Sequence, residues 1–296
     1  MASTRPVGLL DAVRRDCAAI AASARWVRIE ADAPVAHGGL AGLDASVHFL
    51  DGEPEEVARY VLVLDTINFG SGWFASLHVP PGESATTALT RRLTAHARER
   101  GGTWTAGELR RIGPAGVGDV LGQDAEHPLV ALYADALNQL GGWLGDRDAL
   151  QAIAAAGGSA ERLAAQLAAG MPFFDDVGFY KRAQITVNDL ALAGVAAFAD
   201  LDRLTAFADN LVPHVLRTEG MLVYAPALAE RVDAGLPLPA GGGMEREIRA
   251  CAVQACELLA ARWGIPARTL DNWLWNRGQA PGYDDPPPHR TRTVFY

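Results

Sequence analysis

Three polar side chains at helical spacing lie in the segment GFYKRAQITVNDLALAG, residues 178–194. At 100° per residue, Lys181, Gln184 and Asn188 fall within an arc of roughly 60° on one side of a helix. Lys181 is the single lysine among the 26 lysine and arginine residues of the chain. An ammonium is a compact charge whose pKa responds to burial, whereas a guanidinium is planar and stays charged. The segment therefore predicts either a solvated helix face or a site that needs a compact cation.

A second candidate is Asp209, which follows an apolar run in LTAFADNLVPHVLR, residues 204–217. It precedes Asn210 and Pro213, a pattern typical of the start of a helix. One interpretation is that Asp209 caps that helix, and the other is that it is a catalytic carboxylate. The two roles are compatible, because a helix N-terminus helps to keep a carboxylate ionised.

Two further segments combine aromatic rings, acidic groups and turn residues. In LVLDTINFGSGWF, residues 62–74, an apolar helix is expected to end before a glycine-containing turn, and PFFDD, residues 172–176, precedes the lysine segment. Aromatic rings beside flexible turns can form a flat slot for a planar base, although core packing at a helix end produces the same pattern. The candidates in these segments are Asp65, Asn68, Phe69, Trp73, Phe174 and Asp175.

Composition narrows the class of function. The formal net charge of −9 argues against sequence-independent binding to duplex nucleic acid, which depends on many contacts between basic residues and phosphates. The cysteines and histidines form no CxxC or HxxxH pair, so we expect no metal site, and no motif for an organic cofactor is present. Without a long apolar run to predict a signal peptide or a membrane span, a cytoplasmic protein is expected.

The apolar pattern predicts a mostly α-helical fold with a minor sheet of short strands, of which residues 25–30 are the main candidate. We expect one domain, 1–296, in which parts 1–125 and 126–296 pack together, and we expect a monomer. The helices are predicted at 9–24, 53–69, 83–100, 127–144, 146–156, 159–169, 179–198, 201–208, 211–219, 225–234, 243–263 and 268–276.

Two features near the carboxyl end add expectations about packing. Glu245 and Arg249 are four residues apart on a predicted helix, a spacing typical of an ion pair on the helix surface. The tail PGYDDPPPHRTRTVFY is Pro-rich and then aromatic. It is expected either to pack as an extended arm or to be disordered, and its aromatic end favours packing.

Five segments occur in the order seen in a known family. DTINFGSGWF, FYKRAQITVNDL, LTAFADNLVPHVLR, EREIRACAVQACELL and the terminal HRTRTVFY resemble the queuosine salvage protein family, over roughly residues 45–296. Members of that family are queuosine 5′-phosphate N-glycosylases, hydrolases that release the base queuine. One departure is the Gly-Ser-Gly run that separates Phe69 from Trp73, and it bears on the shape of the base slot.

The resemblance implies a helical fold distantly similar to helix-hairpin-helix DNA glycosylases, which place a lysine and an aspartate at one active site. Carried over by motif, Asp209 is the catalytic carboxylate and Lys181 is its partner. Asn68, Phe69 and Phe174 are implied to line the base pocket.

The expected mechanism follows from the bond that is cleaved. Breaking a nucleoside C1′–N bond builds positive charge on the ribose, which a carboxylate such as Asp209 stabilises while it orients or deprotonates water or bonds to the sugar. The base is a 7-deazaguanine, so the ring position that purine nucleosidases commonly protonate is a carbon. Lys181 would bind the 5′-phosphate, donate to the base or set the charge state of Asp209. Because queuine carries an amine, the acids Asp65, Asp175 and Asp189 are expected to attract it.

Two other functions fit part of this pattern. A DNA-repair glycosylase shares the chemistry, but the acidic net charge and the lack of a glycine-rich hairpin before Lys181 disfavour it. A helical binding module for a modified nucleoside shares the pocket without requiring Asp209 for affinity. The expected partner is therefore a small molecule, queuosine 5′-monophosphate or queuosine, rather than duplex nucleic acid or a membrane.

Overall fold

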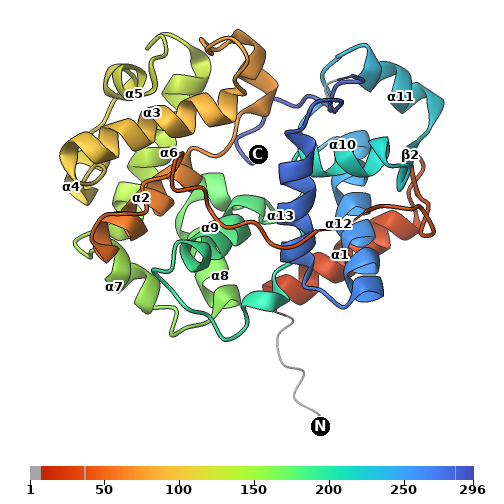
Figure 1. The fold of residues 1–296 in the computed structure, drawn as a ribbon, viewed down its shortest axis with the longest axis horizontal. Coiled ribbons are helices and arrows are strands. Elements are labelled where there is room, and N and C mark those ends of the chain that lie inside the picture. Colours follow the sequence, from red (N-terminus) through yellow and green to blue (C-terminus); the bar gives the residue numbers. More distant parts are fainter. Residues whose placement is uncertain (1–7, 37, 284) are drawn as a thin grey trace.

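Helices make up nearly all of the regular structure in the computed structural model, which describes residues 8–36, 38–283 and 285–296 (Figure 1). The two short strands pair in antiparallel fashion, with Val27 opposite Tyr224. The prediction of a mostly α fold with a minor sheet is thereby confirmed. The elements are α1 (Leu9–Ala22), β1 (Val27–Ile29), α2 (Pro54–Thr66), η1 (Ser71–Ser76), α3 (Ala85–Arg100), α4 (Ala106–Leu109), α5 (Pro114–Leu121), α6 (Pro128–Leu144), α7 (Ala149–Ala154), α8 (Ala160–Gly170), η2 (Pro172–Phe174), α9 (Lys181–Leu192), η3 (Leu201–Arg203), α10 (Leu211–Thr218), β2 (Leu222–Tyr224), α11 (Pro226–Asp233), α12 (Gly243–Trp263) and α13 (Ala267–Gly278).

Local chemistry at the helix ends explains why most of the predicted helices form. α2 begins with Pro54, whose fixed φ and missing N–H suit the first helical position. α3 begins after Ser84, whose hydroxyl accepts from the Thr87 N–H, and it ends at Gly101 with a left-handed φ of 72°. The predicted bounds of α12 are confirmed. The sequence patterns do not predict α4, α5 or β2.

The predicted helix at 201–208 is wrong beyond its first turn, because the residues between η3 and α10 form no helix. The Gln184 side chain accepts from the Thr205 N–H at 2.9 Å. The Asp271 carboxylate accepts from the Phe207 N–H at 2.8 Å. Since side chains of other helices bond these amides, the amides do not form the i to i−4 bonds of a helix.

The buried apolar residues form two clusters. One joins α2 to α9 and includes Leu10 of α1, and the other joins the rest of α1, both strands and α10–α13. In Figure 1 the two groups of helices lie side by side, the first yellow to green and the second blue with α1 in red. Each cluster contains residues from both sides of residue 125, and the division into parts 1–125 and 126–296 stays a prediction.

The carboxyl-terminal segment connects the two groups. The Leu238 N–H donates to the Arg290 main-chain oxygen at 2.8 Å, and the Gly70 N–H donates to the Tyr296 main-chain oxygen at 2.9 Å. Tyr296 is buried, and the chain end lies between the two groups in Figure 1. The aromatic end of the tail is therefore packed, while residue 284 of the same tail lies outside the described residues.

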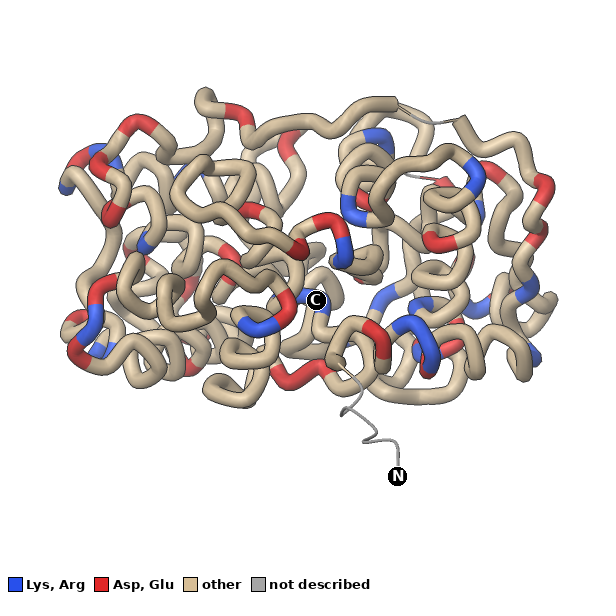
Figure 2. The backbone as a smooth tube through the Cα atoms, turned by 90° about the horizontal axis from the view of Figure 1, so that it is seen from below, with Lys and Arg blue, Asp and Glu red and all other residues tan. Residues whose placement is uncertain are grey.

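Acidic and basic residues are interspersed over both groups of helices in Figure 2. Within the described part of the chain, no helix combines the length and the apolar character needed to cross a membrane. The likeness to helix-hairpin-helix DNA glycosylases stays a prediction.

Candidate active site

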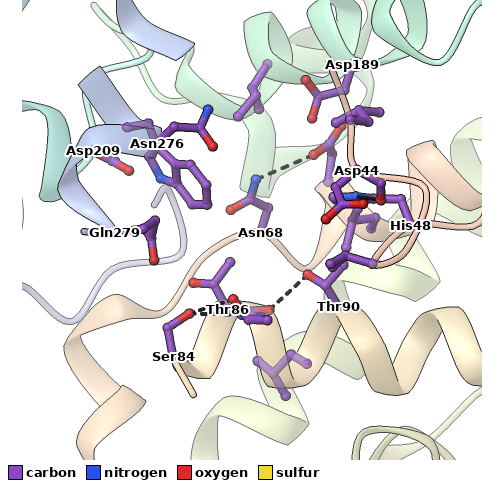
Figure 3. A pocket seen from close by; sticks show the side chains of 18 of the residues that line it. Asp44, His48, Asn68, Ser84, Thr86, Thr90, Asp189, Asp209, Asn276 and Gln279 are labelled. Atoms are coloured by element: carbon purple, nitrogen blue, oxygen red, sulfur yellow. Dashed lines mark hydrogen bonds between the residues drawn. The ribbon is translucent and has the colours of Figure 1, made fainter. Parts of the chain in front are cut away.

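A cavity of about 630 Å³ lies between the two groups of helices. Its wall combines the end of α2 with the turn after it, the start of α3, one side of α9, the segment before α10, and α13. In the view of Figure 3, Asp209 and Asp189 lie on opposite sides of the cavity with Asn68 between them. The predicted site residues that line it are Asp65, Asn68, Phe69, Lys181, Asp189 and Asp209.

Lys181 is the first residue of α9, and only 3% of it is exposed. Its Nζ donates to two oxygens of Asn68, the main-chain oxygen at 3.3 Å and Oδ1 at 3.2 Å. Burial lowers the pKa of the amine, against the opposing effect of the Asp209 and Asp65 carboxylates. The interpretation of this helix face as a solvated stripe is wrong, because its other polar residues are buried as well.

The next residue, Arg182, shows why lysine and arginine are not interchangeable here. Its guanidinium lies between the rings of Phe69 and Phe174, 4.5 and 4.6 Å from their centres. It also donates to main-chain oxygens at the end of α2 and in η2. A planar cation suits a slot between two rings, whereas the paired oxygens of Asn68 receive a compact ammonium.

Asp209 combines the two roles that its sequence position left open. Its Oδ1 accepts from the N–H groups of Leu211 at 2.8 Å and Val212 at 3.0 Å, in the first turn of α10. The residue lines the cavity and is 8% exposed. Both bonds go to Oδ1, so Oδ2 receives no hydrogen bond from the described residues. The helix N-terminus thus holds the Asp209 side chain in place at the cavity wall.

Asp65 and Asp189 form an acidic pair at the same cavity. The Asn68 Nδ2 donates to Asp65 Oδ1 at 3.4 Å, while Asp65 Oδ2 is buried with no partner among the described residues. Burial, and then the charge of Asp189, raise the pKa of Asp65 well above its usual range. Burial also raises the pKa of Asp189 to about 6, against a hydrogen bond from Asn188. A cationic ligand group brought beside this pair would stabilise both charged forms.

Asp271 of α13 is a carboxylate that the sequence reasoning missed. It lines the cavity at 3% exposure, and its Oδ1 accepts from the Phe207 N–H. Burial, and then the nearby Asp209, raise the pKa of Asp271 well above its usual range. A neutral carboxyl can donate a proton or a hydrogen bond, which an ionised one cannot. A signal was present in the sequence, since the acid shares a helix side with the apolar Leu270 and Leu274.

Uncharged polar side chains complete the wall, several of them labelled in Figure 3. No signal of function is present in the sequence for these residues. Hydroxyl residues at a helix start are typical of helix caps, and amide residues on a helix are typical of a solvated face. Those at the start of α3, on α13 and directly after it are Ser84, Thr86, Thr87, Thr90, Asn272, Asn276 and Gln279.

Three of the predicted site residues do not line this cavity. Phe174 is fully buried behind the wall, where its ring packs on Arg182. Trp73 faces the tail, with the Arg292 guanidinium 5.8 Å from its ring centre. Asp175 is exposed, because the turn after η2 directs the next acidic residue inward instead.

The prediction of a surface ion pair between Glu245 and Arg249 is wrong. Both side chains are 3% exposed, and Arg249 Nη1 lies 3.5 Å from Glu245 Oε1. The Arg249 guanidinium also donates to both oxygens of Asp176, at 3.0 and 2.5 Å. The i, i+4 spacing correctly indicates that the two residues meet, but it does not show whether that helix face is covered.

A family model described as queuosine salvage protein matches residues 47–296. The chain belongs to this family. A relative from Sphaerobacter thermophilus, named queuosine 5′-phosphate N-glycosylase/hydrolase, is 36% identical over 320 residues, which cover 98% of each chain. Relatives with the same name are 40% identical over 129 residues in Dictyostelium discoideum, covering 40% of each chain, and 31% identical over 173 residues in Mus musculus, covering 50% of this chain and 51% of that one. The resemblance drawn from the five segments is confirmed.

In this queuosine salvage family member, the cavity brings together two carboxyl groups, those of Asp209 and Asp271, and the amine of Lys181. Asp209 supplies a carboxylate able to stabilise positive charge, and Asp271 supplies a carboxyl whose raised pKa allows it to donate. Lys181 supplies a buried cation near both. Among the described residues, no group of three or more His, Cys, Asp or Glu side chains is arranged to hold a metal ion.

Proposed function

We propose that the protein hydrolyses the N-glycosidic bond of queuosine 5′-monophosphate and releases queuine. The observation that carries the proposal is that Asp209 and Lys181, the pair implied by the resemblance, are both buried and line one cavity. The name of the relative that matches nearly the whole chain supports the same reaction. We further propose that the protein acts as a cytoplasmic monomer on the free nucleotide and not on duplex nucleic acid.

In the proposed reaction, Asp209 lies beside ribose C1′ and stabilises the oxocarbenium-like transition state as the C1′–N bond breaks. Water adds to C1′, and its proton passes to Asp209 or to solvent. The departing base takes up one proton, and Asp271, whose pKa is raised by burial, is the proposed donor. This help matters because the 7-deaza ring carries a carbon where purines can be protonated. Lys181 holds Asn68 in place and brings an amine near the Asp209 carboxyl group.

Two further contacts are proposed for the ends of the substrate. The amine of the base side chain lies beside Asp65 and Asp189, since a cation there stabilises both carboxylates. The 5′-phosphate lies at the start of α3, where Ser84 and Thr86 offer hydroxyl groups and the helix N-terminus favours an anion. In the view of Figure 3 these two regions lie on different sides of the cavity.

The test is to incubate the purified protein, without added metal, with queuosine 5′-monophosphate and separately with queuosine. Chromatography should detect queuine from both, with a higher kcat/KM for the monophosphate. If the folded protein binds the nucleotide but releases no base, it is a binding module and the proposed reaction is wrong. Equal kcat/KM values for the two substrates would contradict the phosphate contact alone.

A further inference from the structure

We infer that Arg249 is a positioning residue that holds the main chain at both Asp209 and Lys181, an inference that rests on the proposed function. Arg249 lies on α12, is 2% exposed and does not line the cavity. Each nitrogen of its guanidinium nevertheless bonds a group next to one of the two candidate catalytic residues.

The first bond acts on Asp209. Arg249 Nε donates at 2.9 Å to the main-chain oxygen of Ala208, the residue directly before Asp209. The segment before α10 forms no helix, so its carbonyl groups lack the partners that a helix would supply. On the other side, Asp209 is held by its bonds to the first turn of α10. Arg249 therefore holds the main chain directly before Asp209, whereas α10 holds the side that follows it.

The second and third bonds act on Lys181 through Asp176. The two terminal nitrogens of Arg249 donate to both oxygens of the Asp176 carboxylate. Asp176 Oδ2 in turn accepts from the Lys181 N–H at 3.3 Å. Lys181 is the first residue of α9, so its N–H has no partner inside the helix. The Asp176 carboxylate supplies that partner and is itself held by the two terminal nitrogens of Arg249.

The tail extends the same cluster to Asn68, the hydrogen-bond partner of Lys181. The Tyr296 hydroxyl donates to Glu245 Oε1 at 2.9 Å, and the Arg249 guanidinium lies 4.5 Å from the centre of the Tyr296 ring. The main-chain oxygen of Tyr296 accepts from the N–H of Gly70, two residues after Asn68. One buried arginine and one tail residue therefore reach all three segments that form the centre of the site.

The geometry explains why this position needs arginine. The Nε bonds Ala208 and the two terminal nitrogens bond Asp176, while the guanidinium carbon lies 4.0 Å from the centre of the Phe179 ring and 4.5 Å from that of the Tyr296 ring. A lysine at this position keeps the charge but offers a single nitrogen, so it cannot hold Ala208 and Asp176 together. A shift of about 1 Å at a reacting group can cost two orders of magnitude in rate.

The test compares Arg249→Lys with Arg217→Lys. Arg217 is a matched control, because it also forms two bonds to one aspartate, Asp233, and stacks on a ring, Tyr224, at 4.6 Å. It does not line the cavity. We expect kcat of Arg249→Lys to fall at least about tenfold with KM within about twofold, and kcat of the control to stay near that of the wild type. An unchanged kcat in a folded Arg249→Lys protein overturns the inference.

A second readout does not depend on activity. Because Lys181 is the only lysine, protein labelled with ¹⁵N-lysine has one backbone lysine amide signal, that of the N–H bonded to Asp176. This measurement uses glutamine variants of the two arginines, because a lysine variant would add a second lysine signal. We expect the Lys181 signal to shift and to exchange faster with solvent in Arg249→Gln and, more weakly, in Tyr296→Phe, but not in Arg217→Gln. If the wild type releases no queuine, the proposed function fails while this measurement still tests the positioning role. A Lys181 amide signal unaffected by Arg249→Gln and Tyr296→Phe overturns that role.

Discussion

Replacing Asp209 by asparagine separates the charge of this residue from its structural role. The side-chain oxygen of asparagine can still accept from the Leu211 and Val212 N–H groups, and asparagine caps helices about as well as aspartate. The loss in folding free energy should therefore stay within about 1 kcal/mol, the scale of a charge at a helix N-terminus. For a chain of this size that corresponds to a fall in Tm of about 2 °C or less.

The expected loss of activity is far larger. Without the carboxylate, no negative charge beside C1′ offsets the charge that develops on the ribose, and we expect kcat to fall by at least about a hundredfold. That factor corresponds to about 2.7 kcal/mol of transition-state stabilisation. The assay follows queuine release from queuosine 5′-monophosphate by chromatography, with Tm measured on the same preparations. Asp209→Ala should lose activity to the same extent but also lose the cap, at a further cost of about 1 kcal/mol in stability.

A matched control is Asp200→Asn. Asp200 also bonds N–H groups at a helix start, those of Ala160 and Glu161, and it does not line the cavity. Its replacement should leave kcat unchanged. The reasoning is refuted if Asp209→Asn retains more than about a third of the wild-type kcat, or if Asp200→Asn loses as much activity, because charge beside the ribose would then not be what matters.

Three further outcomes are expected. Lys181→Arg should lower kcat at least about tenfold with little change in Tm, because a planar guanidinium does not fit where the Lys181 Nζ donates to two oxygens of Asn68. Full activity of this variant would contradict the expectation. Asp189 has a folded pKa of about 6, above its unfolded value, so its contribution to stability is present below about pH 4 and is lost as pH rises through about 6. Asp189→Asn should therefore raise Tm at neutral pH by the equivalent of about 1–2 kcal/mol, allowing for its partial exposure, and by nothing near pH 4 in a calorimetric pH series. Thr86→Val should raise KM several-fold for the monophosphate and leave KM for queuosine unchanged; equal effects on both would argue against a phosphate contact there.

The sequence by itself determined the local structure and the identity of the central residues. Periodic apolar residues, Pro54 at the start of α2 and Gly101 at the end of α3 are enough to place helices, because these signals act within a few residues of one another. The unusual single lysine and the acid before a helix start identified Lys181 and Asp209. The family resemblance then predicted that Lys181 and Asp209 belong to one active site.

Only the tertiary structure decided what covers each helix face. Helical spacing shows that Lys181, Gln184 and Asn188 share a side, but the partner of Lys181 lies 113 residues away, at Asn68. Helical spacing likewise predicts that Glu245 and Arg249 pair on the helix surface, whereas the fold buries both side chains.

The segment before α10 and the carboxyl of Asp271 were missed for the same physical reason. The amides that would have made a helix of this segment are bonded by side chains of α9 and α13, and burial by distant elements changes the proton affinity of Asp271. Both effects depend on long-range contacts. Such contacts form only after the helices have packed, so no local pattern encodes the non-helical segment or the raised pKa. The pattern around Asp271 indicates only that this acid lies near the apolar side of its helix.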